Sequence, residues 1–247
     1  MLNRFSRTEL LLGEENMSKL AQSKIAIFGI GGVGSYVAEG LARCGIGEFI
    51  LIDSDDISLT NINRQIHALE TTIGQKKTLM MKERILAINP QAKVTTIEKL
   101  YTPESNFFNW DDDYTYIVDA VDDVKAKINL IVNANKHNLP IISSMGTANK
   151  LDPQKFVFTD IYKTHTCPLA RIMRKTLKQQ GIKKLKVLYS TEEPFTNYTV
   201  NFKENTSKDN SPASTRKQPL GSISFVPPIA GLMIAGEIVK DICQINR

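Results

Sequence analysis

Four glycines follow the first apolar segment of the chain and carry its clearest chemical signal: Gly29, Gly31, Gly32 and Gly34. The apolar residues 24–28 precede them, and a helix-forming segment follows. In this order, Gly29 permits a tight turn, Gly31 lets main-chain N–H groups approach a phosphate, and Gly34 lets the helix lie close to the sheet. Because a helix amino end also favours negative charge, we predict that this turn binds a nucleotide. The alternative is a purely structural glycine turn.

An acidic residue and a polar segment extend this site. Asp53 ends the apolar residues 49–53, where a carboxylate can accept hydrogen bonds from ribose hydroxyls. The following residues 54–73 are more polar than a simple connection requires. A nicotinamide oxidoreductase would need only the glycines and an acid, and would leave this polar segment unexplained. Its candidate ligand-binding side chains are Asp55, Asn61, Arg64 and Gln65.

Two cations and two carboxylates match the cleavage of ATP between its α- and β-phosphates. Cations stabilise the charge that moves onto leaving pyrophosphate, and carboxylates hold magnesium. The chain supplies Arg64 and Lys77 as cations, and Asp122 and Asp123 as carboxylates after another apolar segment. Each residue alone is more often a surface cation or a helix cap. Together they predict an enzyme that forms an acyl adenylate.

Apolar and helical segments alternate along the chain, which predicts an α/β fold with a Rossmann-like, mostly parallel sheet and helices on both faces. Parallel strands present their carboxyl ends at one edge, so the residues above should meet there. The predicted strands are 24–28, 49–53, 93–98, 114–120, 139–143, 156–161 and 186–189, and the predicted helices are 8–22, 33–44, 74–89, 124–135, 168–179 and 229–242. We expect an ATP-binding part over residues 1–150. A smaller substrate-binding and dimerisation part of the same domain should cover 151–247, with a mobile loop over about 191–220.

Composition excludes several classes of protein. The 247 residues, 42% of them hydrophobic, suffice for one substantial core. Three dispersed cysteines form no CxxC pair, which predicts no zinc and favours a reducing, cytoplasmic setting. No run approaches the ~20 apolar residues of a membrane span. Small residues in 229–242 favour a buried helix or a dimer contact over membrane attachment.

A basic stretch in the second half gives two open interpretations. Its cations are Arg171, Arg174, Lys175, Lys178, Lys183, Lys184 and Lys186, of which all but Lys186 are candidate RNA contacts. They form either an ordinary solvated face or a surface that contacts RNA. The net charge of +5 permits an acidic partner without identifying one. His67 lies near the predicted site, where we expect it to hydrogen-bond the loop.

The motifs of residues 29–34, 53–65, 73–77 and 118–123 resemble those of the ubiquitin-activating-enzyme-like adenylating enzymes, the ThiF/MoeB/HesA family. The resemblance implies that Asp53 binds ribose, that Asn61 and Arg64 approach the triphosphate, that Lys77 contacts phosphate and that Asp122 supports magnesium. The arginine motif of residues 4–7 implies a homodimer in which Arg7 reaches the ATP of the other subunit.

Four further segments resemble the tRNA threonylcarbamoyladenosine dehydratase branch of this family: residues 63–69, 164–170, 189–194 and 221–227. That branch implies ATP-dependent cyclisation of a tRNA nucleoside through an acyl adenylate, releasing AMP and pyrophosphate. Cys167 stands where an acidic residue is expected and receives no catalytic role. A requirement for an alkali cation and the use of a sulfur-relay partner, a cysteine desulfurase system, stay open.

Two alternatives remain at this point. An adenylyltransferase that activates the C-terminus of a ubiquitin-like sulfur carrier would use the same ATP site. Such branches usually hold zinc through two CxxC pairs, which this chain lacks. A non-enzymatic nucleotide-sensing module would bind ATP without releasing AMP or pyrophosphate.

Overall fold

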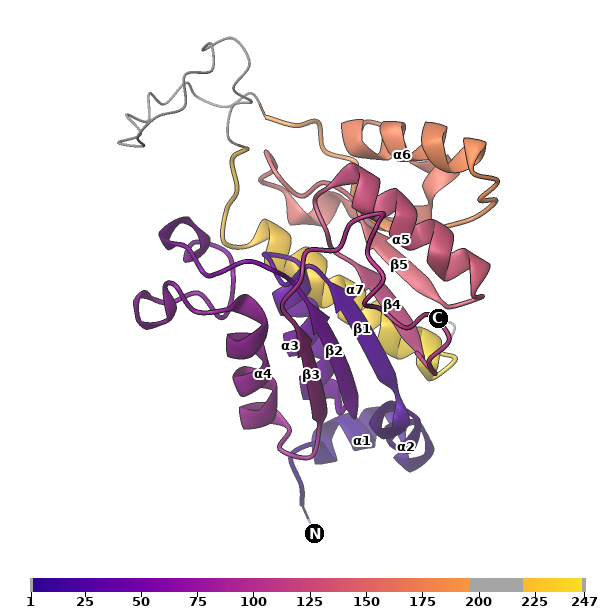
Figure 1. Ribbon diagram of the computed structural model, residues 1–247. Helices are drawn as coiled ribbons and strands as arrows, with labels where there is room; N and C mark the ends of the chain where they lie inside the picture. Colours follow the sequence, from indigo (N-terminus) through magenta and orange to yellow (C-terminus); the bar gives the residue numbers. More distant parts are fainter. Residues whose placement is uncertain (1, 196–219, 246–247) are drawn as a thin grey trace.

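The computed structural model describes residues 2–195 and 220–245. Within them, seven strands form one sheet in the order β3-β2-β1-β4-β5-β7-β6 (Figure 1). Every neighbouring pair is parallel except β6 and β7, which confirms the mostly parallel α/β fold. The strands are β1 (Lys24–Phe28), β2 (Glu48–Ile52), β3 (Lys93–Ile97), β4 (Tyr116–Asp119), β5 (Ile141–Ser144), β6 (Phe156–Asp160) and β7 (Lys186–Ser190).

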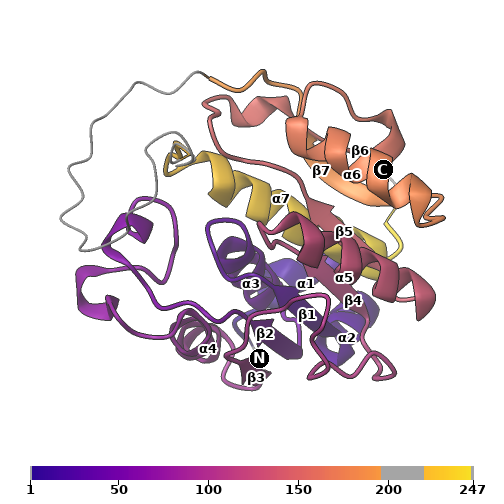
Figure 2. The same cartoon turned by 45° about the horizontal axis from the view of Figure 1, so that its top comes forward.

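Helices cover both faces of this sheet (Figure 2). One face packs against α3, α4 and α7, and the other packs against α5, α6 and an aromatic segment over residues 101–114. The helices are α1 (Ser6–Leu12), α2 (Glu14–Gln22), α3 (Gly34–Cys44), α4 (Lys77–Ile88), α5 (Val124–Lys136), α6 (Pro168–Gln179) and α7 (Val226–Ile242). Because β1 to β5 run parallel, their carboxyl ends share one edge, as predicted.

The amino-terminal segment departs from the prediction. A single helix over residues 8–22 is wrong, because two helices, α1 and α2, meet at Gly13. Gly13 has φ +82° and ψ 159°, a backbone conformation that L side chains rarely adopt and that ends the first helix. The glycine therefore turns the chain before α2 leads into β1.

The carboxyl-terminal helix α7 lies against α3 in the core. It begins at Val226, three residues earlier than predicted, with Pro227 and Pro228 in its first turn, where proline is well tolerated. A Cβ on Gly231 would lie 2.4 Å from the carbonyl oxygen of Val33, so the two backbones approach closely. The buried helix expected from its small residues is confirmed. Across the described ranges, no helix combines the length and the apolar character needed to cross a bilayer.

The carboxyl-terminal part extends the same sheet through β6 and β7. The division at residue 150 thus separates two regions that share one sheet, and it stays a prediction. Most of the loop predicted over 191–220 lies outside the described residues, because the structure describes nothing between 196 and 219.

Candidate functional site

The glycine turn joins β1 to α3, and space fixes two of its positions. Gly29 has φ +87°, and a Cβ there would lie 2.6 Å from the carbonyl oxygen of Ala120. A Cβ on Gly34 would lie 1.8 Å from the carbonyl oxygen of Gly29. These contacts confirm the steric reasons given above for both glycines. Gly31 is more open, since a Cβ there would have Gln65 Nε2, 3.9 Å away, as its nearest neighbour.

Asp53 ties the glycine turn to the end of β2. Its Oδ2 accepts a 2.6 Å hydrogen bond from the N–H of Ile30, and its Oδ1 accepts one of 2.9 Å from the N–H of Asp55. Burial raises the pKa of this carboxyl, while the positive charge of Lys77 and the two N–H donors oppose the rise. The carboxylate thus already organises the turn, and its contact with a ribose stays a prediction.

Two neighbouring lysines are paired with two neighbouring aspartates where α4 begins. Lys77 Nζ lies 2.6 Å from Asp55 Oδ2, with the lysine side chain only 8% exposed and the aspartate 62% exposed. Lys76 Nζ lies 2.7 Å from Asp56 Oδ1, with the lysine 36% exposed. Lys77 is the first residue of α4, so its ammonium and the helix amino end concentrate positive charge at one point. Asp55 positions this cation, a role that the sequence did not assign to it.

Two predicted residues of the crossover, Arg64 and Asn61, lie near the glycine turn. The Cγ and Cδ of Arg64 lie 3.4 Å and 3.5 Å from where a Cβ on Gly32 would stand. Arg64 Nη1 donates 2.9 Å bonds to the carbonyl oxygen of Thr60 and to Asn63 Oδ1. Asn61 is buried, and its Oδ1 accepts a hydrogen bond from the N–H of Ser58. These contacts hold Arg64 beside the turn, and its contact with phosphate stays a prediction.

The side chain of His67 is buried against the glycine turn. Its Nε2 lies 2.9 Å from the carbonyl oxygen of Ile30, which confirms the hydrogen bond to the loop that we expected. Nδ1 has no partner among the described residues, and neither has the Oε1 of buried Gln65. Desolvation, together with the positive charges of Lys77 and Arg84, lowers the pKa of His67 to about 4. The imidazole is therefore neutral at physiological pH.

The residues after β4 present one free carboxylate. Asp123 caps α5 by accepting a 2.8 Å hydrogen bond from the N–H of Ala126. Asp122 is exposed and makes no hydrogen bond or ion pair with the described part of the chain. Within that part, no three His, Cys, Asp or Glu side chains form a metal site. Magnesium commonly needs only one or two protein carboxylates beside substrate phosphates, so Asp122 fits such a role.

The four branch segments join in two pairs whose members are separated in the sequence. Asn63 Nδ2 donates a 3.1 Å bond to the carbonyl oxygen of Ser222, which joins the first segment to the fourth. The rings of His165 and Tyr189 lie 5.6 Å apart, edge to face, which joins the second to the third. The C-terminal half thus contributes to the same edge as the glycine turn.

The sequence analysis missed two residues that hold this half together. Asn149, at φ +56°, accepts hydrogen bonds from the N–H of Phe195 through its carbonyl oxygen and from the N–H of Gly221 through Oδ1. Lys150 is buried and donates to the carbonyl oxygen of Glu192, and burial lowers the pKa of its ammonium group. Asparagine tolerates positive φ better than most residues, but the sequence alone does not show which asparagine adopts it.

The basic stretch contains an exposed row and two residues with other partners. Its exposed cations are Arg171, Lys175, Lys178, Lys183 and Lys184. Arg174, in contrast, donates to the carbonyl oxygen of Thr164 and is half-buried, so we leave it out of the row. Lys186 pairs with Asp241 at 2.7 Å on α7.

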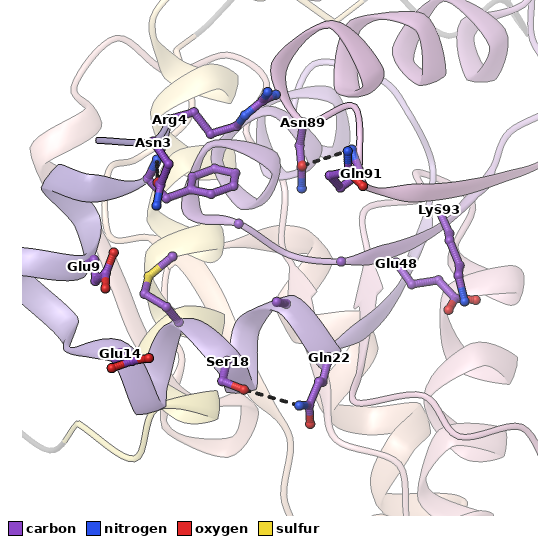
Figure 3. Close-up of a pocket in the computed structure, with 15 residues that line it drawn as sticks. Asn3, Arg4, Glu9, Glu14, Ser18, Gln22, Glu48, Asn89, Gln91 and Lys93 are labelled. Atoms are coloured by element: carbon purple, nitrogen blue, oxygen red, sulfur yellow. Dashed lines mark hydrogen bonds between the residues drawn. The ribbon is translucent and has the colours of Figure 1, made fainter. Parts of the chain in front are cut away.

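Arg7 and a separate cavity lie away from the glycine turn. Arg7 is exposed on α1, which packs near the amino ends of the strands. A cavity of about 730 Å³ opens there, and Figure 3 shows acidic and basic side chains around it, among them Arg4, Glu9 and Lys93. This cavity contains none of the predicted ATP residues. The residues predicted to bind ATP lie at the carboxyl edge, apart from this cavity, and Arg7 lies on α1 at the other end of the sheet (Figure 1).

Comparison with known proteins identifies the family of this chain. The ThiF family model matches residues 5–247. The chain belongs to the ThiF family. It is 43% identical over 247 residues to the tRNA threonylcarbamoyladenosine dehydratase of Bacillus subtilis, a match that covers 99% of this chain and 96% of the relative.

Two further relatives separate the branches of the ThiF family. The crystal structures of the Escherichia coli tRNA N6-threonylcarbamoyladenosine dehydratase with AMP and with ATP each give a TM-score of 0.83 at 32% identity, covering 98% of this chain and 94% of that one. The Escherichia coli molybdopterin-synthase adenylyltransferase is only 28% identical, over 63% of this chain and 62% of its own length. The similarity to the dehydratases thus continues through the C-terminal half.

Proposed function

We propose that this ThiF-family chain is an ATP-dependent tRNA threonylcarbamoyladenosine dehydratase. The observation that carries the proposal is that the first and fourth branch segments meet beside the glycine turn, while the second and third contact each other. The full-length similarity to the Bacillus subtilis dehydratase supports it.

The reaction joins the substrate carboxylate to AMP and then closes a ring. A carboxylate oxygen of threonylcarbamoyladenosine attacks the α-phosphorus of ATP, and pyrophosphate leaves. The carbamoyl group of the same side chain then attacks the acyl carbon, a proton is lost, and AMP leaves with the carboxylate oxygen. Since the second attack is intramolecular, effective molarity replaces an enzyme nucleophile. The absence of an assigned catalytic cysteine agrees with this route.

The chain's own residues supply the electrostatics. Lys77 and the amino end of α4 concentrate positive charge, and Arg64 lies beside the glycine turn. We assign these groups to the charge that develops on pyrophosphate during the first step. Asp122 would hold magnesium, which supplies further neutralisation of the phosphates when bound.

The basic row of Arg171, Lys175, Lys178, Lys183 and Lys184 is assigned to the tRNA. Its exposure and spacing support contact with a phosphate backbone, whose binding releases counterions. We also propose a homodimer, because Arg7 could approach a nucleotide only in the other subunit. An alkali cation, a sulfur-relay partner and a cytoplasmic location stay predictions.

Nucleoside mass spectrometry tests the function directly. Transfer RNA that carries threonylcarbamoyladenosine is incubated with the protein and ATP, and the expected product has lost one water. Omission of ATP and unmodified tRNA are the controls. If the nucleoside keeps its mass while a ubiquitin-like carrier stimulates pyrophosphate exchange, the adenylyltransferase alternative replaces this proposal. ATP binding without either reaction selects the nucleotide-sensing module.

A further inference from the structure

A fully buried ionic cluster lies beneath the site, at the carboxyl ends of β4 and β5. It consists of Asp119, Lys127 and Ser143, each 0% exposed. Lys127 Nζ lies 2.8 Å from Asp119 Oδ2, and the hydroxyl of Ser143 lies 2.5 Å from the same oxygen. Lys127 Nζ is also 3.4 Å from Ser143 Oγ. Three elements therefore meet at one carboxylate: β4, α5 and β5.

Stability alone does not account for this cluster. Removing two charges from water is costly, and a buried ion pair can often be replaced by apolar residues of similar size without loss of stability. Burial raises the pKa of Asp119, while Lys127 and Ser143 oppose the rise, so desolvation of the carboxylate is substantial. A function other than stabilising the core should explain why this position carries charges.

The cluster lies between the loop of residues 120–123 and the helix α5 that begins at its end. Asp119 Oδ1 accepts a 3.3 Å hydrogen bond from the N–H of Val121, at the start of the loop. The N–H of Lys127 donates 3.0 Å to the carbonyl oxygen of Asp123, at its end. Asp119 thus binds the loop through its side chain, and the side chain of Lys127 holds Asp119 from the helix that follows the loop.

The same loop touches the glycine turn and holds the free carboxylate. The N–H of Ala120 donates 2.9 Å to the carbonyl oxygen of Phe28, the last residue of β1. Asp123 is engaged as the helix cap, which leaves Asp122 as the carboxylate of the loop that is available to a ligand. A shift of this loop would move Asp122 relative to the turn.

We propose that Asp119, Lys127 and Ser143 are positioning residues that hold Asp122 toward the metal-bound phosphates of the nucleotide. The proposal rests on the ATP chemistry proposed above. Because Asp119 and Lys127 neutralise each other, the cluster orients Asp122 without adding a second net negative charge that would compete for the cation. Groups that orient a metal ligand in this way typically contribute 10- to 100-fold to metal affinity or activity.

The test measures metal binding separately from catalysis. Binding of Mn²⁺ to the protein with a non-hydrolysable ATP analogue is followed by electron paramagnetic resonance, and metal-free analogue binding is measured by calorimetry in EDTA. For the double variant Asp119→Asn/Lys127→Met, we expect Mn²⁺ affinity to fall about 10-fold or more. Metal-free nucleotide affinity and the thermal midpoint should stay close to those of the parent.

Two further variants keep the test decisive. Ser143→Ala retains the ion pair and loses one hydrogen bond, so Mn²⁺ affinity should fall about threefold; this variant carries the test if the double variant does not fold. Lys186→Met/Asp241→Asn removes an ion pair of similar length on β7 and α7, and should leave Mn²⁺ affinity unchanged.

Unchanged Mn²⁺ affinity in a folded Asp119→Asn/Lys127→Met variant, or in Ser143→Ala, would overturn the positioning role. So would an equal loss in the Lys186→Met/Asp241→Asn control. Asp122→Asn should abolish Mn²⁺ binding with the nucleotide analogue. Retained Mn²⁺ binding in this variant would show that Asp122 is not the metal ligand and would overturn the proposal. Since these measurements contain no tRNA, failure of the dehydratase proposal would show separately, as an unchanged nucleoside mass.

Discussion

The free energy of unfolding should fall in mildly acidic solution because His67 takes up a proton in the unfolded chain but not in the folded one. The imidazole is 4% exposed, its Nε2 bonds the carbonyl oxygen of Ile30, and its pKa is lowered from 6.5 to about 4. Between these two pH values, the unfolded chain binds a proton that the folded chain excludes. The free energy of unfolding therefore falls as the pH is lowered through this window.

The magnitude follows from the shift in pKa. Relative to pH 7.5, the loss at pH 5 is about 2 kcal/mol, and the full shift of 2.5 pKa units corresponds to about 3.4 kcal/mol. His67→Gln keeps an amide donor for Ile30 and cannot titrate. We expect its stability to change with pH about 2 kcal/mol less than that of the parent between pH 7.5 and pH 5.

Urea denaturation at a series of pH values measures this difference. Comparing the two curves cancels the contributions of the carboxyl groups that both proteins share. Parallel curves for the parent and His67→Gln would refute the argument that burial keeps His67 neutral.

Three other predictions concern the turn, the cations and the tRNA surface. Lys77→Met should reduce AMP formation ~10²-fold or more in a rapid-quench assay. Lys76→Met removes the adjacent and more exposed lysine and should change AMP formation only a few-fold. Equal effects of the two substitutions would contradict the role assigned to Lys77. Gly34→Ala should lower the free energy of unfolding, measured with denaturant, by at least ~3 kcal/mol because its Cβ would meet a carbonyl oxygen. Gly236→Ala, in open space on α7, should raise that free energy by about 0.4–1 kcal/mol. For tRNA binding, Lys183→Glu/Lys184→Glu should make the slope of log K against log salt concentration shallower by about 2. Lys93→Glu, at the amino end of β3, should leave this slope unchanged. An unchanged slope in the double variant would mean that Lys183 and Lys184 belong to an ordinary solvated face.

Local patterns were sufficient to predict the strands and the glycine turn. A parallel strand buried on both faces reads as a short apolar run, and the steric need for glycine at Gly29 and Gly34 is set by the immediate chain path. The amino-terminal helices were merged because Gly13 lies within a helix-forming pattern, and its positive φ depends on how α1 and α2 pack.

The buried ionic cluster was missed for a different reason, although the sequence contains a signal for it. Lys127 stands at helical spacing with Leu130, Ile131 and Ala134, so a lysine occupies the apolar stripe of α5. Such a position demands a buried anion, but only the pairing of β4 with β5 brings Asp119 and Ser143 to it. Contacts between distant segments, such as Asn63 with Ser222, have no local signature at all.

The transfer of an oxygen atom from substrate to AMP tests the acyl-adenylate claim most directly. Threonylcarbamoyladenosine in tRNA is labelled with ¹⁸O in its carboxylate, and AMP is analysed by mass spectrometry after a single turnover with ATP. The account predicts that each AMP carries one ¹⁸O, because the attacking carboxylate oxygen stays on the α-phosphorus when the ring closes. AMP without label, or the release of ADP and phosphate in its place, would contradict it.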